Sequence, residues 1–203
     1  MDPDRAIGRR ATRADVPALV ATIGLAFADD PVWGRVFARA GDRAEPLWRL
    51  FIEGALRHDW VWTTDGAGAV AVWIPPGETE LSDEQEATLA RAAGEILGPE
   101  GAAYLDEVML AFGTAHPQDE PHYYLSLLGT HPTQRGHGIG MRLLAQNLAS
   151  IDLERRPAYL ESSNPANNLR YEGVGFRPIG RFSLPADGPV VTTMWRPAGG
   201  ALS

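Results

Sequence analysis

The stretch that decides the fold reads Thr130-His131-Pro132-Thr133-Gln134-Arg135-Gly136-His137-Gly138-Ile139-Gly140-Met141. An apolar and aromatic run, residues 122 to 129, precedes it and is typical of a strand. After it, residues 141 to 151 carry apolar side chains at the spacing of a helix. The sequence therefore predicts a strand, a tight loop and a helix.

The loop suits a bulky anion such as a phosphate group. Gly136, Gly138 and Gly140 let the backbone approach a ligand closely, because no Cβ intervenes and a positive φ costs little. The next helix begins with N–H groups that lack intrahelical partners and with the positive end of its dipole. Arg135 adds a guanidinium for a charge-assisted hydrogen bond. A glycine-rich turn with a flexible arginine is the simpler alternative.

The spacing of the glycines excludes two common phosphate loops. A Walker loop requires Gly-Lys-Ser or Gly-Lys-Thr, and the chain contains no lysine. The dinucleotide fingerprint is G-x-G-x-x-G, whereas residues 136–140 read G-x-G-x-G. Residues 134–140 instead resemble the pyrophosphate loop of the GNAT family of acyl-CoA N-acetyltransferases. The coenzyme A-binding residues that this resemblance implies are Gln134, Arg135, Gly136, His137, Gly138, Ile139, Gly140 and Met141, with Leu128, Gly129 and Thr130 of the preceding strand.

A second segment resembles the same family. It reads Asn164-Pro165-Ala166-Asn167-Asn168-Leu169-Arg170-Tyr171-Glu172-Gly173-Val174-Gly175-Phe176, like the family's N-x-x-x-x-x-x-Y-E-x-x-G-F segment. Residues 10–17, 26–29, 69–73 and 159–162 also resemble one branch, that of the puromycin N-acetyltransferases. Residues 30–58 and 77–121, where acceptor specificity usually lies, resemble that branch poorly, so the substrate does not carry over.

Length and composition describe one α/β domain over residues 1–203. Apolar residues at 44% and charged residues at 22% are those of an ordinary globular protein. We expect a loose tail from residue 197 on. The chain has no run of about 18 apolar residues, and its start lacks a signal-peptide core. We therefore expect a cytoplasmic protein without a membrane segment.

The residue types exclude several chemistries and partners. Without cysteine there is no thiolate nucleophile, and an acetyl-cysteine intermediate is excluded. The five histidines show no metal-ligand spacing, so we expect no metal. The net charge of −8 argues against nucleic acid and favours a cationic substrate.

Alternating strands and helices are expected along the chain. Thr12 with Asp15 and Ser82 with Gln85 resemble capping boxes, which predict helix starts. Gly98-Pro99 stops the second of these helices. The expected strands are residues 9–11, 60–64, 69–74, 122–129, 158–161, 176–184 and 190–196. The resemblance implies that they form a central mixed, mostly antiparallel sheet of about seven strands flanked by helices, as in the GNAT fold.

The chemistry of amine acetylation indicates which side chains to seek. An alkylamine with a pKa near 10 must lose a proton before it attacks a thioester, which calls for a carboxylate or a histidine. The leaving thiolate needs a proton, which a phenol can supply. Tyr171 matches the family's tyrosine by position and is assigned the acid role, although it also suits a half-buried core residue. Glu161 is a candidate base or water holder, or a solvated glutamate at a strand end.

Other candidates have weaker support. The resemblance implies that Asn164 and Asn167 offer amides to the pantetheine arm or to the loop, although Asn164-Pro165 also suits a helix-capping turn.

Asp29, Asp30 and Trp33 follow the first helix and are candidate acceptor contacts, because an acidic and aromatic rim suits a cationic amine. Ordinary solvated aspartates are the alternative. His122, at the start of the central strand, is a candidate acceptor residue or base, and a satisfied or exposed histidine is the alternative.

The sequence thus predicts an acetyltransferase that moves acetyl from acetyl-CoA directly to the amine of a small cationic molecule in a ternary complex. The acceptor, the general base, the acyl-chain preference and the oligomeric state, monomer or homodimer, stay open. The alternatives are a protein lysine or N-terminal acetyltransferase and a non-catalytic acyl-CoA-binding regulatory module.

Overall fold

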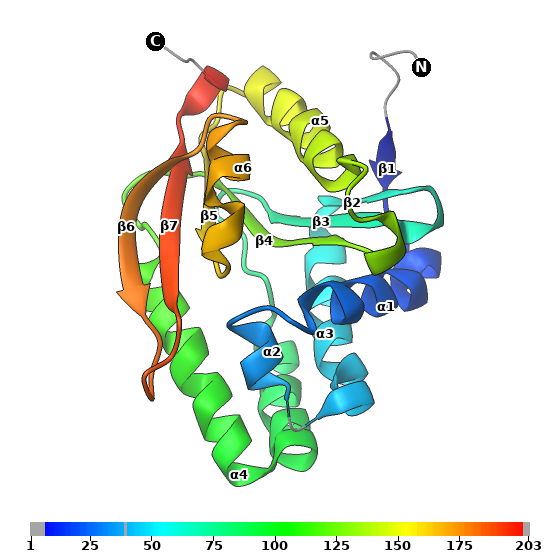
Figure 1. Ribbon diagram of the computed structural model, residues 1–203, viewed down its shortest axis with the longest axis vertical. Coiled ribbons are helices and arrows are strands. Elements are labelled where there is room, and N and C mark those ends of the chain that lie inside the picture. The colour runs from blue at the N-terminus through cyan, green and yellow to red at the C-terminus, as the bar shows by residue number, and fades with distance from the viewer. Residues whose placement is uncertain (1–6, 39, 201–203) are drawn as a thin grey trace.

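The computed structural model describes residues 7–38 and 40–200 and is built on one seven-stranded mixed sheet. The strand order is β1-β2-β3-β4-β5-β7-β6, in which β4 and β5 are parallel and all other neighbours are antiparallel (Figure 1). The expected mixed, mostly antiparallel sheet is confirmed. The strands are β1 Gly8–Arg10, β2 Val61–Thr64, β3 Ala69–Ile74, β4 Tyr123–Thr130, β5 Ala158–Ser162, β6 Arg177–Ser183 and β7 Val190–Arg196.

Both predicted capping boxes are present. Thr12 and Asp15 cap a 3-10 turn that leads into α1, and Ser82 with Gln85 caps α4. Among the described residues, no helix is long and apolar enough to cross a membrane. The α-helices are α1 Val16–Phe27, α2 Trp33–Val36, α3 Glu45–Ala55, α4 Asp83–Ala115, α5 Ile139–Leu153 and α6 Asn168–Glu172.

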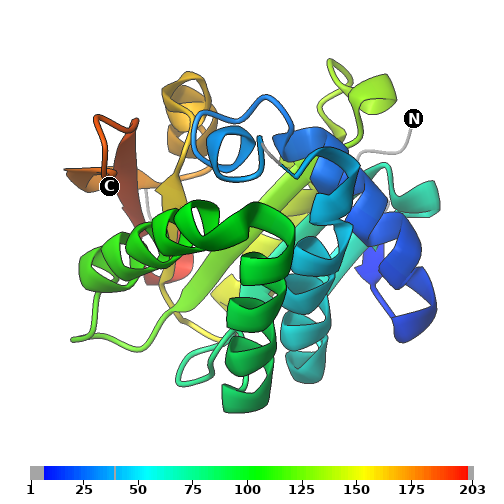
Figure 2. The same cartoon turned by 90° about the horizontal axis from the view of Figure 1, so that it is seen from below.

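Helix α4 changes direction where the sequence predicts a stop. Gly98 has φ 75° and ψ 174°, which leaves the helical region and is readily adopted by glycine. Pro99 then begins the second segment, where a missing N–H is tolerated. The two segments therefore point in different directions (Figure 2), and the end of the second one reaches β4 and β5.

Both faces of the sheet are covered, which strand β3 illustrates. Its even-numbered residues, such as Val72, belong to the apolar cluster with α1, α3 and α4, whereas Trp73 and its odd-numbered neighbours belong to the cluster with α5. All six residues of this strand are buried, as expected for a central strand with helices on both sides. Of the predicted tail, Ala198–Gly200 forms a 3-10 turn, and residues 201–203 lie outside the described residues.

Strands β4 and β5 part in the middle of the sheet. They pair only from Tyr123 with Ala158 to Leu125 with Leu160, and both strands then continue without each other. On its other edge β4 stays paired with β3, but with a bulge that leaves Ser126 opposite no residue of β3. Bulges bend the strand that carries the extra residue and re-aim its side chains. The two strands are therefore no longer paired with each other on the C-terminal side of Leu125 and Leu160.

Candidate active site

A cleft of about 610 Å³ lies where β4 and β5 part. The C-terminal half of β4, the start of α5, the end of β5 and helix α6 line it, and the loop between α1 and α2 borders it. It therefore brings together segments that are more than a hundred residues apart in the chain. The predicted residues that line the cleft are Leu128, Gly129, Thr130, Gln134, Arg135, Gly136, Gly138, Ile139, Gly140, Met141, Glu161, Asn164, Asn167, Tyr171, Asp29, Asp30 and Trp33.

The three glycines of the loop serve different purposes. Gly136 and Gly138 have φ values of 82° and 69°, which would strain the backbone of any residue other than glycine. A Cβ on Gly140 would lie 2.4 Å from Thr130 Oγ1, so this glycine permits α5 to approach β4. Gly138 is the N-cap of α5, whose first N–H groups have no partner inside the helix. The loop thus has the backbone shape that an anion site requires.

Two side chains of the loop have hydrogen-bond partners within the protein. Arg135 Nη2 donates a hydrogen bond to the carbonyl of Ala26 at 3.0 Å, so its guanidinium is tied to the end of α1. His137 is exposed and does not line the cleft, and its Nδ1 donates to the Gln134 carbonyl at 3.3 Å. Arg135 still lines the cleft, whereas His137 does not.

The C-terminal half of β4 has an open edge beside the cleft. Beyond Leu125 the strand pairs with β3 alone, and Leu128, Gly129 and Thr130 line the cleft. Gly129 packs against α1, where an added Cβ would lie 2.8 Å from Ile23 Cδ1. Unpaired strand groups of this kind can bind an extended ligand arm in the way a neighbouring strand would.

Tyr171 lies on α6 and faces the same cleft. Its ring contacts Phe176 with centroids 6.3 Å apart, so the core and the cleft share this residue. Burial, with a smaller contribution from the charge of Asp30, raises the pKa of Tyr171 to about 12. The phenol therefore keeps its proton at neutral pH.

Glu161 is the buried carboxylate of the cleft. Its side chain is 2% exposed, and neither oxygen has a hydrogen-bond partner among the described residues. The nearest cationic candidate is His116, whose Nδ1 lies 3.7 Å from Glu161 Oε1. Burial raises the pKa of the Tyr124 and Tyr159 phenols, and the charge of Glu161 adds to this effect.

Glu80 also lines the cleft and was not found from the sequence. Burial raises its pKa to about 7, the hydroxyl of Ser126 lowers it by donating a hydrogen bond, and the charge of Glu161 raises it further. Two carboxylates therefore face one region of the cleft. The residue precedes the capping box at Ser82 in a segment without strand or helix pattern, so nothing in the sequence distinguishes it from a loop residue.

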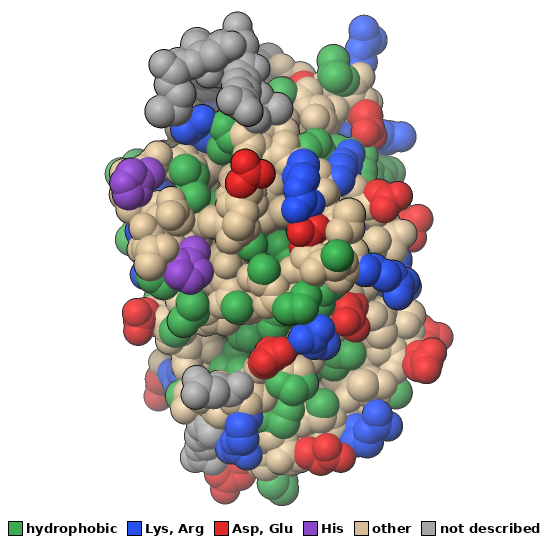
Figure 3. Space-filling model, turned by 90° about the vertical axis from the view of Figure 1, so that its right-hand side faces the viewer, with side chains coloured by type: hydrophobic (Ala, Val, Ile, Leu, Met, Phe, Trp, Pro, Cys, Tyr) green, Lys and Arg blue, Asp and Glu red, His purple; other side chains and the backbone are tan. Residues whose placement is uncertain are grey.

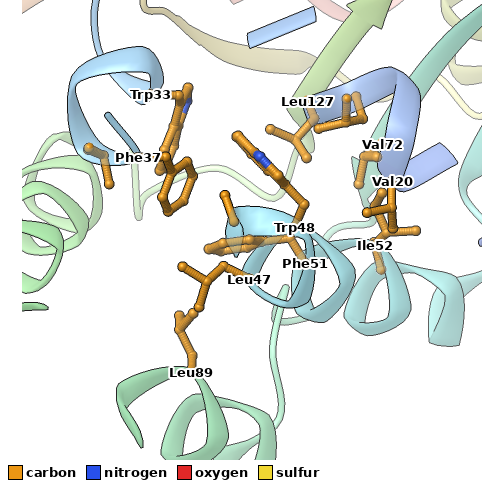
Figure 4. Close-up of a cluster of buried hydrophobic side chains, with 14 of the residues drawn as sticks. Val20, Trp33, Phe37, Leu47, Trp48, Phe51, Ile52, Val72, Leu89 and Leu127 are labelled. Atoms are coloured by element: carbon orange, nitrogen blue, oxygen red, sulfur yellow. The ribbon is translucent and has the colours of Figure 1, made fainter. Parts of the chain in front are cut away.

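Aromatic side chains form another wall of the cleft. Trp33 of α2 is 9% exposed and packs against Trp48 and Phe51 of α3 (Figure 4). Phe112 of α4 joins this group with its ring centroid 5.9 Å from that of Trp33. Trp33, Trp48 and Phe51 are buried, and Phe112 is partly buried against them. The apolar surface of this wall suits the body of an organic molecule.

The acidic loop after α1 is partly structural. Asp30 Oδ1 accepts from the backbone N–H groups of Val32 and Trp33, and its Oδ2 accepts from Ser163 Oγ at 2.7 Å. Asp30 thus ties the start of α2 to the end of β5. Asp29 is exposed at the border of the cleft.

The remaining predicted residues have local partners. Asn164 Oδ1 accepts from the N–H of Ala166 at 3.0 Å, which is the capping role, and Asn167 Oδ1 accepts from Arg170. Both asparagines still line the cleft. His122 does not: it lies behind Glu161, buried against Tyr159 and Trp195. The structure therefore separates His122 from the acceptor surface, because it precedes β4 at the end where β4 and β5 are still paired.

The model of the acetyltransferase (GNAT) family matches residues 55–176, which include β4, the glycine loop, Glu161 and Tyr171. The chain belongs to this family. It is therefore an acyltransferase, as the strand-loop-helix unit and the tyrosine segment indicate. The family model does not distinguish the puromycin branch from others.

Solved structures share the fold of this acetyltransferase over nearly its whole length. One is a histone acetyltransferase HPA2 and related acetyltransferase from Corynebacterium glutamicum, 24% identical, covering 97% of each chain with a TM-score of 0.65. Arylalkylamine N-acetyltransferase 2 from Aedes aegypti is 12% identical, covers 94% of this chain and 98% of its own, and has a TM-score of 0.69. A polyamine N-acetyltransferase from Drosophila melanogaster, which forms N-acetylagmatine, is 15% identical, covers 94% and 99%, and has a TM-score of 0.65.

One face of this acetyltransferase carries charges of both signs. On the side that carries α1 and β1, arginine side chains alternate with Asp and Glu, and apolar side chains gather near the middle (Figure 3). Among the described residues, no cluster of three or more His, Cys, Asp or Glu side chains is arranged to hold a metal ion.

Proposed function

We propose that this acetyltransferase transfers acetyl from acetyl-CoA directly to the primary amine of a small cationic molecule, within a single domain. The observation that carries the proposal is the shared cleft. The glycine loop lies at one part of it, and Glu161, Glu80 and Tyr171 line another. An acetyl donor and an amine could thus be held together, which a direct transfer requires.

The residues of the loop and of β4 fit coenzyme A. The pyrophosphate would meet the N–H groups at the start of α5, where Gly136 and Gly138 leave room for close approach. The open edge of β4 at residues 126–130 would pair with the amide-bearing pantetheine arm. Asn164 and Asn167 would add side-chain amide donors. The bound group supplies an acetyl thioester, which is activated toward amines.

Tyr171 and the two carboxylates would manage the protons. Glu161 takes a proton from the ammonium, because an amine attacks only in its neutral form. Glu80, whose pKa burial raises to about 7, is partly ionised at neutral pH and adds to the attraction for the arriving cation. The Tyr171 phenol, which keeps its proton, donates to the departing sulfur.

The acceptor would be an amine with an apolar body. Glu80 and Glu161 attract a positive charge, and the wall around Trp33 offers aromatic surface for the rest of the molecule. Two structural neighbours are enzymes of arylalkylamines and of agmatine, which supports the choice of small amines. The resemblance to the puromycin branch does not extend to the segments where acceptor specificity usually lies, so puromycin is tested as one amine among several.

The test is thiol release from acetyl-CoA in the presence of a panel of amines: phenylethylamine, agmatine, spermidine, puromycin and a lysine peptide. We expect at least one small amine to give turnover that saturates with both substrates. Turnover with the peptide alone would indicate a protein acetyltransferase. Tight coenzyme A binding without turnover for any amine would indicate a regulatory module instead.

A further inference from the structure

A row of side chains leads from Glu161 through His116 to His122, which precedes β4 at the end where β4 and β5 are paired. Glu161 Oε1 lies 3.7 Å from His116 Nδ1, and His116 Nε2 lies 3.0 Å from His122 Nε2. His122 Nδ1 in turn lies 2.6 Å from the carbonyl oxygen of Glu120. The His116 side chain is 27% exposed, whereas that of Glu161 is 2% exposed. The row thus joins a buried carboxylate of the cleft to a ring that water reaches.

The last contact of the row fixes where the hydrogens are. A carbonyl oxygen only accepts, so His122 Nδ1 carries a hydrogen. Burial lowers the pKa of His122, which keeps this ring neutral and leaves its Nε2 as an acceptor. His116 Nε2 must then be the donor. In neutral His116 the unprotonated nitrogen is therefore Nδ1, the atom that faces Glu161.

The other groups around His116 are phenols and a second carboxylate. Tyr124 of β4 and Tyr159 of β5 face its ring with centroids 4.9 and 5.0 Å away, and both phenols stay protonated because burial raises their pKa. Glu80, from the segment before α4, is close enough to His116 for the charge of that ring to lower the Glu80 pKa, against the larger effect of burial. Carboxylates and neutral phenols thus surround the His116 ring.

We propose that His116 is the proton acceptor behind Glu161, a positioning residue that returns Glu161 to its charged form during each reaction. This proposal rests on the proposed acetyl transfer. The ammonium gives one proton to Glu161, and Glu161 passes it to His116 Nδ1 once the two groups close from 3.7 Å to hydrogen-bond distance; His116 then releases it to water. The nitrogen of the neutral substrate amine then forms the bond to the acetyl carbon as the C–S bond breaks. The amine nitrogen loses its second proton, and this loss balances the proton that the sulfur receives, so each acetylation releases one proton overall.

The kinetic test uses His116→Gln. A glutamine keeps an N–H donor for His122 but has no group that can gain a proton near neutral pH. We expect kcat at pH 7 to fall about 10- to 100-fold, with the KM of acetyl-CoA within about twofold. Added imidazole should restore part of the loss. An unchanged kcat, or a loss that is equal at every pH and not relieved by imidazole, would overturn the relay.

A second measurement does not depend on turnover. Nitrogen-15 NMR of the histidine rings reports which nitrogen carries the hydrogen, and His122→Asn serves as the comparison variant. We expect neutral His116 to carry its hydrogen on Nε2 in the wild type and to lose this preference in His122→Asn. Hydrogen on Nδ1 in the wild type would overturn the proposal even if the enzyme is active. A wild type without turnover but with the expected Nε2–H form would instead reject the acetyl transfer alone.

Discussion

The two parts of the cleft are built in different ways. The cofactor part is made of backbone: the glycine loop, the first turn of α5 and the open edge of β4. The acceptor part is made of side chains from separate segments, with Glu80 before α4, Glu161 on β5 and Trp33 on α2. A backbone site depends on a few φ values and on helix geometry, whereas a side-chain site depends on which residues the fold brings together. The acceptor part can therefore change while the cofactor part stays the same.

The largest effect should come from Glu161→Gln. The substitution keeps the shape but removes the charge that takes the amine proton, so we expect kcat/KM for the amine to fall about 10³-fold. Coenzyme A affinity should change by less than about threefold, because the carboxylate belongs to the acceptor part. Thiol release and calorimetric titration measure the two quantities. An equal loss of kcat/KM for the amine and of coenzyme A affinity would contradict the division of the cleft into a cofactor part and an acceptor part.

Tyr171→Phe should have the next largest effect. The ring still packs against Phe176, but the phenolic proton is absent, so kcat should fall about 10²-fold. The binding of acetyl-CoA should persist. Wild-type turnover in this variant, measured by thiol release under saturating substrates, would remove Tyr171 from the mechanism.

Glu80→Gln tests the electrostatics of the acceptor part through stability. Burial raises the pKa of Glu80 from 4.5 to about 7, so the folded protein binds a proton more tightly than the unfolded chain does. The resulting stabilisation is fully present below pH 4.5 and is lost as the pH rises through 7, on the order of 3 kcal/mol.

In Glu80→Gln this decline should be absent, as urea unfolding at pH 5 and pH 8 would show. Since Glu80 and Glu161 interact, Glu161→Gln should weaken the same decline. If the free energy of unfolding changes with pH in the same way in the wild type and in both variants, Glu80 does not have a raised pKa in the folded protein.

Gly138→Ala should have the smallest effect, about tenfold weaker coenzyme A binding. An alanine at φ 69° costs about 1 kcal/mol and shifts the N–H groups at the start of α5. Gly66→Ala is the matched control, because Gly66 has φ 62° and ψ 20°, close to the φ 69° and ψ 10° of Gly138, has no atom within 4 Å of an added Cβ, and lies outside the cleft. Both variants should lose similar stability by thermal unfolding. Equal coenzyme A affinity in the two would indicate that the loop does not hold the pyrophosphate.

The same contrast explains what the sequence could predict. The seven strands, the capping boxes and the break at Gly98 follow from local patterns that adjacent residues carry. The glycine loop and Tyr171 lie in contiguous motifs, so their place in the cleft could be expected. Glu80 and His116 carry no local pattern, because their environment is created by the kink of α4 and by the bulge at Ser126. His122 could not be placed for the same reason.

The central claim is that coenzyme A lies along the open edge of β4 with its pyrophosphate at the start of α5. Hydrogen–deuterium exchange of the wild type with and without coenzyme A tests it most directly. We expect slower exchange at residues 126–130 and 135–142 when coenzyme A is present, with no change in β6, which lies at the far edge of the sheet. Unchanged exchange at residues 126–142 under saturating coenzyme A would contradict the account.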